Sequence, residues 1–231
     1  MLRKARKTAE LLQALWPMVV SNVPGPIGYD LRYRYWKPRL KHLGVGVILE
    51  PGVFFQEPTR ISIGDHSWID RGVIVLAGVD ASAREKIELK NEAFRGEPGA
   101  VHIGSYVHIA PHCIISGISG GVFISDYCTL SANSKVYALT HHYRSGRDPR
   151  KPNVHFGSMG PDEEQCLLQG PVQIGRNTGV ALNSVILPGV SLPEDCFVSI
   201  NSVVSRHPFR KNTIIGGNPA RSGEPRYLVD E

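Results

Sequence analysis

An aliphatic residue stands at every sixth position over long stretches of this 231-residue chain. The longest run is unbroken and consists of Ile174, Val180, Ile186, Leu192, Val198 and Val204; shorter runs are Ile63, Ile69 and Val75, then Ile103, Ile109 and Ile115, then Leu130 and Val136. Neither an α-helix nor an alternating strand produces this spacing, because their periods are near 3.6 and 2. Hexapeptide repeats are typical of β-helices.

The repeat has a direct physical interpretation. Three six-residue sides make one circuit of about eighteen residues, and the aliphatic residue of each side points inward. The next residue is often small, as at Gly64, Ala181 and Ser199, which lets the chain turn a corner. Circuits stack at the ordinary strand spacing of about 4.7–4.9 Å, and only this stacking creates a core. The sequence therefore predicts an all-β solenoid.

The domain organisation follows from where the repeat starts and stops. We expect an N-terminal helical cap over residues 1–44, a β-helix domain over 45–221 and a polar tail over 222–231. The cap contains an amphipathic stretch at residues 3–20, ended by Pro24-Gly25-Pro26, and would close the first coil. Two polar loop insertions are expected at 77–100 and 143–170, and loops of this length are often functional.

The positive charge is concentrated at the N-terminus. The formal net charge is +5, yet residues 1–43 hold nine basic and two acidic residues, whereas the remainder holds seventeen basic and nineteen acidic. No basic surface runs along the whole domain, so we do not expect a nucleic-acid partner. Besides capping the coil, a basic amphipathic segment can contact a membrane surface, so residues 1–43 are a candidate for peripheral membrane contact.

The four cysteines indicate a reducing environment. Cys113, Cys128, Cys166 and Cys196 form no CxxC pair, and three of them precede an aliphatic repeat position by two residues. Buried free thiols are the expected result. We therefore expect a cytoplasmic protein, with membrane association through the N-terminal segment as an addition.

Three features together resemble one enzyme family. They are the six-residue repeat, the segment Thr140-His141-His142-Tyr143 and the run Ile215-Gly216-Gly217-Asn218-Pro219-Ala220-Arg221. Over about residues 45–221 the chain resembles the hexapeptide-repeat acyltransferases, in particular the maltose/galactoside acetyltransferases and the surface-polysaccharide O-acetyltransferases. The resemblance implies a left-handed parallel β-helix, a homotrimer with sites between subunits, acetyl-coenzyme A as donor substrate, a saccharide acceptor and no metal.

The resemblance also implies roles for individual residues. Acyl transfer to a hydroxyl needs a base, and histidine titrates near neutral pH. The family's base maps to His141, with His142 as the rival. Asn133 and Tyr143 are the expected acceptor-binding residues, although Asn133 also suits a coil corner, where asparagine tolerates the left-handed conformation.

The expected donor-binding residues are spread over the C-terminal part. They are Ala181, Ser199, Ser205, Arg206, Asn218, Pro219 and Arg221. The small residues would expose backbone groups to the pantetheine arm, and arginine can form charge-assisted bonds with phosphate. One departure from the family is Gly179, which stands where its members usually carry tryptophan and which would widen the cleft near the thioester.

The function expected from these residues is acetyl-coenzyme A-dependent O-acetylation of a saccharide hydroxyl, in surface polysaccharide biosynthesis. The enzymatic alternative is an amino-sugar N-acyltransferase on the same fold. Less favoured alternatives are a non-catalytic β-helical scaffold and a γ-type carbonic anhydrase, which would need three histidines around zinc.

Overall fold

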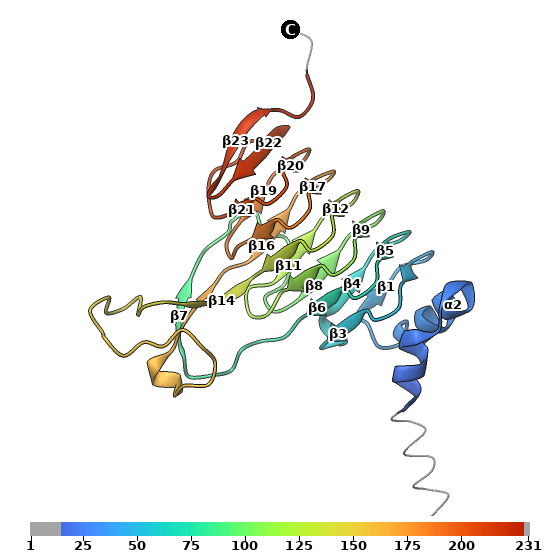
Figure 1. The fold of residues 1–231 in the computed structure, drawn as a ribbon, viewed down its shortest axis with the longest axis horizontal. Coiled ribbons are helices and arrows are strands. Elements are labelled where there is room, and N and C mark those ends of the chain that lie inside the picture. Colours follow the sequence, from blue (N-terminus) through green and yellow to red (C-terminus); the bar gives the residue numbers. More distant parts are fainter. Residues whose placement is uncertain (1–14, 229–231) are drawn as a thin grey trace, which may run out of the picture.

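The chain folds into a triangular prism of stacked coils, capped at one end by helices (Figure 1). A computed structural model describes residues 15–228, so the first part of the predicted amphipathic helix lies outside the described residues. Residues 15–22 are helical, and α2 spans Gly25–Trp36. Two short 3-10 helices, η1 (Pro58–Arg60) and η2 (Asp162–Glu164), complete the helical content of the described part.

Three parallel sheets form the faces of the prism, which we call A, B and C in the order in which the chain visits them. Face A consists of β1 (His42–Leu43), β4 (Ile61–Ile63), β8 (Val101–Ile103), β11 (Val122–Ile124), β16 (Val172–Ile174) and β19 (Ser191–Leu192). Face C consists of β3 (Phe54–Gln56), β6 (Ile74–Leu76), β10 (Ile114–Ser116), β13 (Lys135–Tyr137), β18 (Val185–Ile186) and β21 (Val203–Val204).

Face B is longer because it includes the C-terminal hairpin. Its strands are β2 (Ile48–Leu49), β5 (Trp68–Ile69), β9 (His108–Ile109), β12 (Thr129–Leu130), β17 (Gly179–Val180), β20 (Phe197–Val198), β22 (Thr213–Gly217) and β23 (Ala220–Pro225). All pairs within the faces are parallel except β22 with β23. One circuit of the three faces is a rung.

The six-residue repeat is confirmed as the core. Each face contributes one inward row in which register partners stack from rung to rung, and every member of these rows is buried. The rows are Leu43, Ile63, Ile103, Ile124, Ile174 and Leu192 on face A; Leu49, Ile69, Ile109, Leu130, Val180, Val198 and Ile215 on face B; and Phe55, Val75, Ile115, Val136, Ile186 and Val204 on face C. All four cysteines are buried free thiols, as expected. Burial raises the pKa of Cys113 and of Cys128 to about 11, so both stay protonated.

The described part of the N-terminal helical segment covers the first rung. The buried guanidinium of Arg32 donates from Nε to the Leu49 carbonyl (2.6 Å) and from Nη1 to the Val23 carbonyl (2.6 Å). The Trp36 ring packs edge-on against Phe55, with centroids 4.9 Å apart. These contacts tie α2 to the open end of faces B and C, which would otherwise expose unpaired strand groups.

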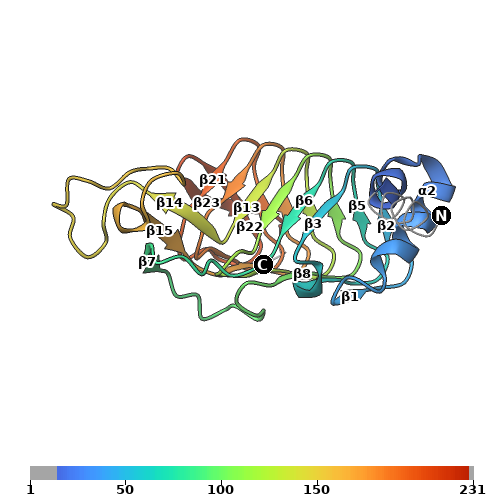
Figure 2. The same cartoon turned by 90° about the horizontal axis from the view of Figure 1, so that it is seen from below.

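Both insertions leave the prism at the edge where face C passes to face A. The first lies between β6 and β8 and the second between β13 and β16. They differ from the expected loops because they contain three strands, β7 (Glu85–Glu88), β14 (Leu139–His142) and β15 (Cys166–Gln169), which form a separate sheet. The second insertion therefore departs from the coil at residue 139 rather than 143. This small sheet, which we call the arm, stands away from the prism (Figure 2).

Candidate active site

The register of the arm fixes where His141 points. Strands β14 and β15 pair antiparallel, with His141 opposite Leu167 and His142 opposite Cys166. Strand β15 also pairs in parallel with β7 from the first insertion. Because side chains alternate along a strand, His141 and His142 lie on opposite faces of the arm. His141 and His142, the two candidate bases, are therefore in different surroundings.

The two imidazoles differ in what holds them. The His142 ring is bound at Nδ1 to the carbonyl of Arg144 (2.8 Å) and packs against Tyr143. The Nε2 atom of His141 is shielded from solvent and has no hydrogen-bond partner among the described residues. The Phe156 ring lies edge-on to His141, with centroids 5.9 Å apart. A shielded and unpartnered imidazole nitrogen can take a proton from a bound ligand.

Glu85 of the first insertion holds the second insertion in place. Its carboxylate accepts hydrogen bonds from the Ser145 hydroxyl (2.6 Å) and from the backbone N–H groups of Gly146 and Arg147 (both 2.8 Å). Burial alone would raise the pKa of Glu85, but these donors outweigh it and hold the pKa below its usual range. The charged carboxylate thus fixes the turn that follows His141.

A second tie joins the two insertions farther along the arm. The Arg84 guanidinium pairs with Asp162 at 3.1 Å, and the backbone N–H of Ala83 donates to the same carboxylate at 3.0 Å. Asp162 belongs to η2, which directly precedes β15. The arm is therefore built from segments almost eighty residues apart in sequence.

The predicted acceptor residues lie in two different places. Tyr143 directly follows β14 and is exposed, with the Arg144 guanidinium over its ring. Asn133 stands at the edge between faces B and C, with a φ of 61°. Strand β13 crosses face C between Asn133 and the arm, so a single chain does not bring Asn133 beside His141. Its backbone has the corner conformation that was the alternative interpretation of this residue.

Ala181 and Ser199 stack at the same edge between faces B and C. The Ala181 N–H donates to the Val198 carbonyl and the Ser199 N–H to the Ile215 carbonyl, which places these residues one above the other. Gly216 follows in the next rung, and a Cβ there would lie 3.2 Å from the Ser199 hydroxyl. Asn218 and Pro219 form the turn of the C-terminal hairpin, and Arg221 pairs with Gly216 across it. This part of the predicted donor set forms one continuous row.

Gly179 leaves a recess beside that row. It lies on the outer side of face B between Thr129 and Phe197, and a Cβ would meet the Phe197 ring at 3.1 Å. A cavity of about 210 Å³ opens here, and Tyr127, Ser131 and Arg226 also line it. The structure therefore has open space beside Gly179, and its use by the thioester stays a prediction.

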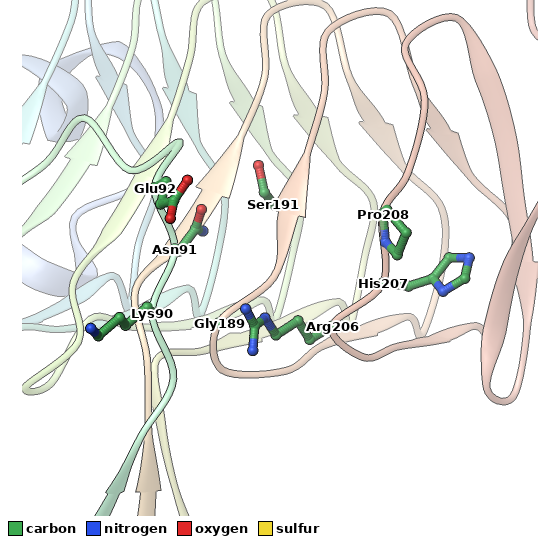
Figure 3. Close-up of a pocket in the computed structure, with 8 residues that line it drawn as sticks. All are labelled: Lys90, Asn91, Glu92, Gly189, Ser191, Arg206, His207 and Pro208. Atoms are coloured by element: carbon green, nitrogen blue, oxygen red, sulfur yellow. The ribbon is translucent and has the colours of Figure 1, made fainter.

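Ser205 and Arg206 lie at a different edge, where face C passes to face A. Arg206 lines a cavity of about 560 Å³ between the first insertion and the last complete rungs (Figure 3). The lining residues are Lys90, Asn91, Glu92, Gly189, Ser191, Arg206, His207 and Pro208. The amide nitrogen of Asn91 donates to the carbonyls of Pro171 and Val190, both at 3.0 Å, and so anchors this wall to the prism. Two cations, Lys90 and Arg206, thus contribute to one open cavity.

Nothing in the sequence directly indicated that Lys90 and Asn91 line the same cavity as Arg206. The first insertion reads only as a polar segment, and more than one hundred residues separate Lys90 from Arg206. No local pattern connects them. The only signal was indirect, namely that a long insertion in a compact repeat is often functional.

The described residues form neither a metal cluster nor a membrane-spanning helix. Within residues 15–228, no group of three or more His, Cys, Asp or Glu side chains is arranged to hold a metal ion. Over the same residues, no helix combines the length and apolar character needed to cross a bilayer.

Fold and arm together define a parallel β-helix of the hexapeptide-repeat type that carries a histidine on a lateral sheet.

No family profile matches the chain. Among curated proteins, the dTDP-4-amino-4,6-dideoxy-D-glucose acyltransferase of Escherichia coli is 29% identical over 190 residues, which cover 81% of this chain and 85% of that protein. WbbJ of E. coli strain K12, named for O-acetyl transfer in lipopolysaccharide biosynthesis, is 34% identical over 52% of this chain and 55% of its own length.

The solved structures agree on the fold. The N-acyltransferase AntD from Bacillus cereus, in complex with dTDP and 3-hydroxybutyryl-coenzyme A, superposes with a TM-score of 0.66 at 23% identity, covering 85% of this chain and 88% of AntD. These curated relatives are acyltransferases, and AntD is in complex with a coenzyme A thioester, which confirms the resemblance to the hexapeptide-repeat acyltransferases found in the motifs.

Proposed function

We propose that this protein transfers an acyl group from acyl-coenzyme A to a saccharide, with His141 as the general base. The observation that carries the proposal is the shielded Nε2 atom of His141, which has no partner among the described residues. The relatives support it, since they are acyltransferases named for sugar substrates.

In the proposed reaction, a nucleophilic O–H or N–H of the acceptor attacks the carbonyl carbon of the thioester. His141 Nε2 removes the proton as the new bond to carbon forms. Collapse of the tetrahedral intermediate breaks the carbon–sulfur bond, and the proton passes to the departing thiolate, so free coenzyme A leaves. His142 remains the rival base, because its Nδ1 atom is bound to the Arg144 carbonyl and its Nε2 atom is thereby left free to accept a proton; the test below separates the two histidines.

We assign donor binding to two edges of the prism. The row of Ala181 and Ser199, together with Asn218, Pro219 and Arg221, would accept the pantetheine arm, and Gly179 would leave room near the thioester. Arg206, which follows Ser205, and Lys90 would bind phosphate groups in the larger cavity, because their two positive charges outnumber the single carboxylate there, that of Glu92. Acetyl-coenzyme A is the expected donor.

The separation of these residues supports a site between subunits. Asn133 and Ala181 lie at the edge between faces B and C, whereas His141 lies beyond the edge between faces C and A. In a homotrimer, as the family resemblance implies, the arm of one subunit would meet the other edge of its neighbour. We also infer a left-handed coil from the resemblance and a cytoplasmic location from the four free cysteines.

The N-terminal segment adds a proposed membrane contact. Trp16, Met18 and Ile27 are exposed on the capping helices, and most of the basic excess of the chain lies in residues 1–43. A basic segment with exposed apolar side chains suits an anionic membrane surface. Such a contact would hold the enzyme near a lipid-linked saccharide.

The test measures release of free thiol from acetyl-coenzyme A with a saccharide panel. His141→Ala is expected to lower turnover by about 10²–10⁴-fold with the unfolding midpoint unchanged. His142→Ala is the matched control, since it removes the neighbouring ring from the opposite face of the arm. Full activity of His141→Ala beside an inactive His142→Ala would show that the base is wrongly assigned.

A further inference from the structure

Buried polar atoms without partners gather on the arm. Such atoms occur on five side chains of the described chain: His141 Nε2 and Gln169 Oε1 belong to the arm, Gln165 Oε1 is on the residue directly before β15, and the other two lie elsewhere. Buried polar groups in folded proteins are usually hydrogen-bonded, so a concentration of exceptions in one place requires a cause.

The free atoms of the two glutamines are hydrogen-bond acceptors. The Gln169 amide nitrogen donates to the Glu88 carboxylate at 3.1 Å, which orients the amide and leaves its oxygen free. The Gln165 amide nitrogen likewise donates to the Gly160 carbonyl. Neither amide can be reversed without placing its oxygen against another oxygen.

These acceptors share a face of the arm with His141. Gln169 pairs with Leu139, and His141 pairs with Leu167, so Gln169 is the diagonal neighbour of His141 on the same face. Diagonal neighbours lie about 7–8 Å apart, within reach of long side chains acting on one ligand. Gln165 has extended backbone and precedes Leu167 by two residues, which places it on this face as well.

A ligand that forms hydrogen bonds with these free atoms must donate hydrogens, because the free atoms on this face are acceptors. A hydroxyl carries one hydrogen, which the general base removes. A primary amine carries two, so one can go to His141 while the other stays bound to a second acceptor.

We propose that the acceptor group is a primary amine of a saccharide and that Gln169 orients it; this inference rests on the proposed acyl transfer. The amine nitrogen attacks the thioester carbon with its lone pair while Gln169 Oε1 holds one N–H. His141 Nε2 takes the other proton, the carbon–sulfur bond breaks, and an amide and free coenzyme A result.

One neighbour of His141 belongs to an exposed part of the second insertion. The free atoms are shielded, while residues 147–153 are all exposed and contain no strand. Phe156 contacts His141 but is itself largely exposed. Segments with few buried contacts open at low cost, so this one can admit the acceptor.

The test pairs hexosamines with the corresponding hexoses, free and linked to a nucleoside diphosphate, using acetyl-coenzyme A. The expected product is an amide, which survives hydroxylamine treatment that cleaves esters. Gln169→Leu is expected to lower kcat/KM for amines by about tenfold while leaving coenzyme A affinity unchanged. Gln56→Leu, a glutamine on face C, is the matched control.

A substrate-independent measurement accompanies the kinetics. Gln169→Leu removes a shielded acceptor that has no partner together with an exposed hydrogen bond to Glu88, so the two effects offset each other and the ligand-free protein should keep its unfolding midpoint within about 2 °C. A clear loss of stability would show that Gln169 has a structural role and overturn its assignment. Ester products from hexoses, with amines inert, would overturn the amine but leave acyl transfer intact. If wild-type protein neither binds coenzyme A nor transfers its acyl group, the proposed function itself fails.

Discussion

At the scale of single residues, the site depends on side chains whose partners lie far away in sequence. Glu85 holds the turn after His141, and Lys90 lies across the larger cavity from Arg206. His141 could be singled out from its own segment because the Thr-His-His-Tyr motif is local. Glu85 could not, since a glutamate in a charged stretch gives no sign of accepting three hydrogen bonds from residues 145–147.

Glu85→Gln is expected to loosen the arm in a pH-dependent manner. The folded-state pKa of Glu85 is lowered, so its stabilising contribution is present above the unfolded-state pKa and is lost as pH falls through the folded-state value. Proteolysis of residues 143–165 should therefore accelerate on acidification in the wild type. In Glu85→Gln it should be faster already at neutral pH, with a weaker response to acid. Equal rates for both proteins at pH 7 would argue against this role.

Lys90→Ala and Arg206→Ala are each expected to weaken coenzyme A binding by about tenfold, because each removes one charge-assisted contact with phosphate. Titration calorimetry at two salt concentrations would check this, since the contribution of both cations should shrink at high salt. Lys135→Ala, on the outer side of face C, is the control. Unchanged affinity in both variants would remove the cavity from the donor site.

At the scale of elements, the sequence predicted the prism well and the arm poorly. The inward rows can be predicted from the sequence because burial selects aliphatic residues at a fixed period, as from Ile174 to Val204. The strands of the arm show no such period, and β7 reads as a charged loop because its residues are Glu85, Lys86, Ile87 and Glu88. Its strand conformation comes from pairing with β15, which lies about eighty residues later. Tertiary pairing of this kind leaves no local trace.

Ile124→Ala tests the stacked rows. Ile124 is fully buried between Ile103 and Ile174, so the substitution removes packing on both sides and leaves a cavity. We expect a loss of about 2–5 kcal/mol in the free energy of unfolding. Val45→Ala, at a largely exposed position, should cost less than about 0.5 kcal/mol. Denaturant titration of both variants would measure the difference.

At the scale of the whole molecule, the two open ends of the prism are closed by different elements. The hairpin of β22 and β23 closes one end, and α2 closes the other through the buried Arg32. Composition revealed a basic N-terminal segment but not that one of its arginines is internal. That distinction depends on carbonyls of Val20, Val23 and Leu49 converging on Arg32 in three dimensions.

Arg32→Ala is expected to destabilise the protein by about 3 kcal/mol, because several charge-assisted hydrogen bonds to buried carbonyls are lost. Arg34→Ala is the matched control, since Arg34 pairs with Asp30 on the exposed side of the same helix and such pairs contribute about 0.3–0.5 kcal/mol. Thermal unfolding of the two variants would separate these outcomes. Equal midpoints would mean that the cap does not support the first rung.

The position of the two insertions has a consequence for how such a protein can diversify. The chain makes two excursions from one corner, yet the inward rows continue across both without a shift of register. Lateral segments can therefore lengthen, shorten or be exchanged while the scaffold keeps its fold. Under the proposed assignment, contacts with new acceptors would change on the arm while the row of Ala181 and Ser199, which is assigned to the donor, keeps its place on the prism.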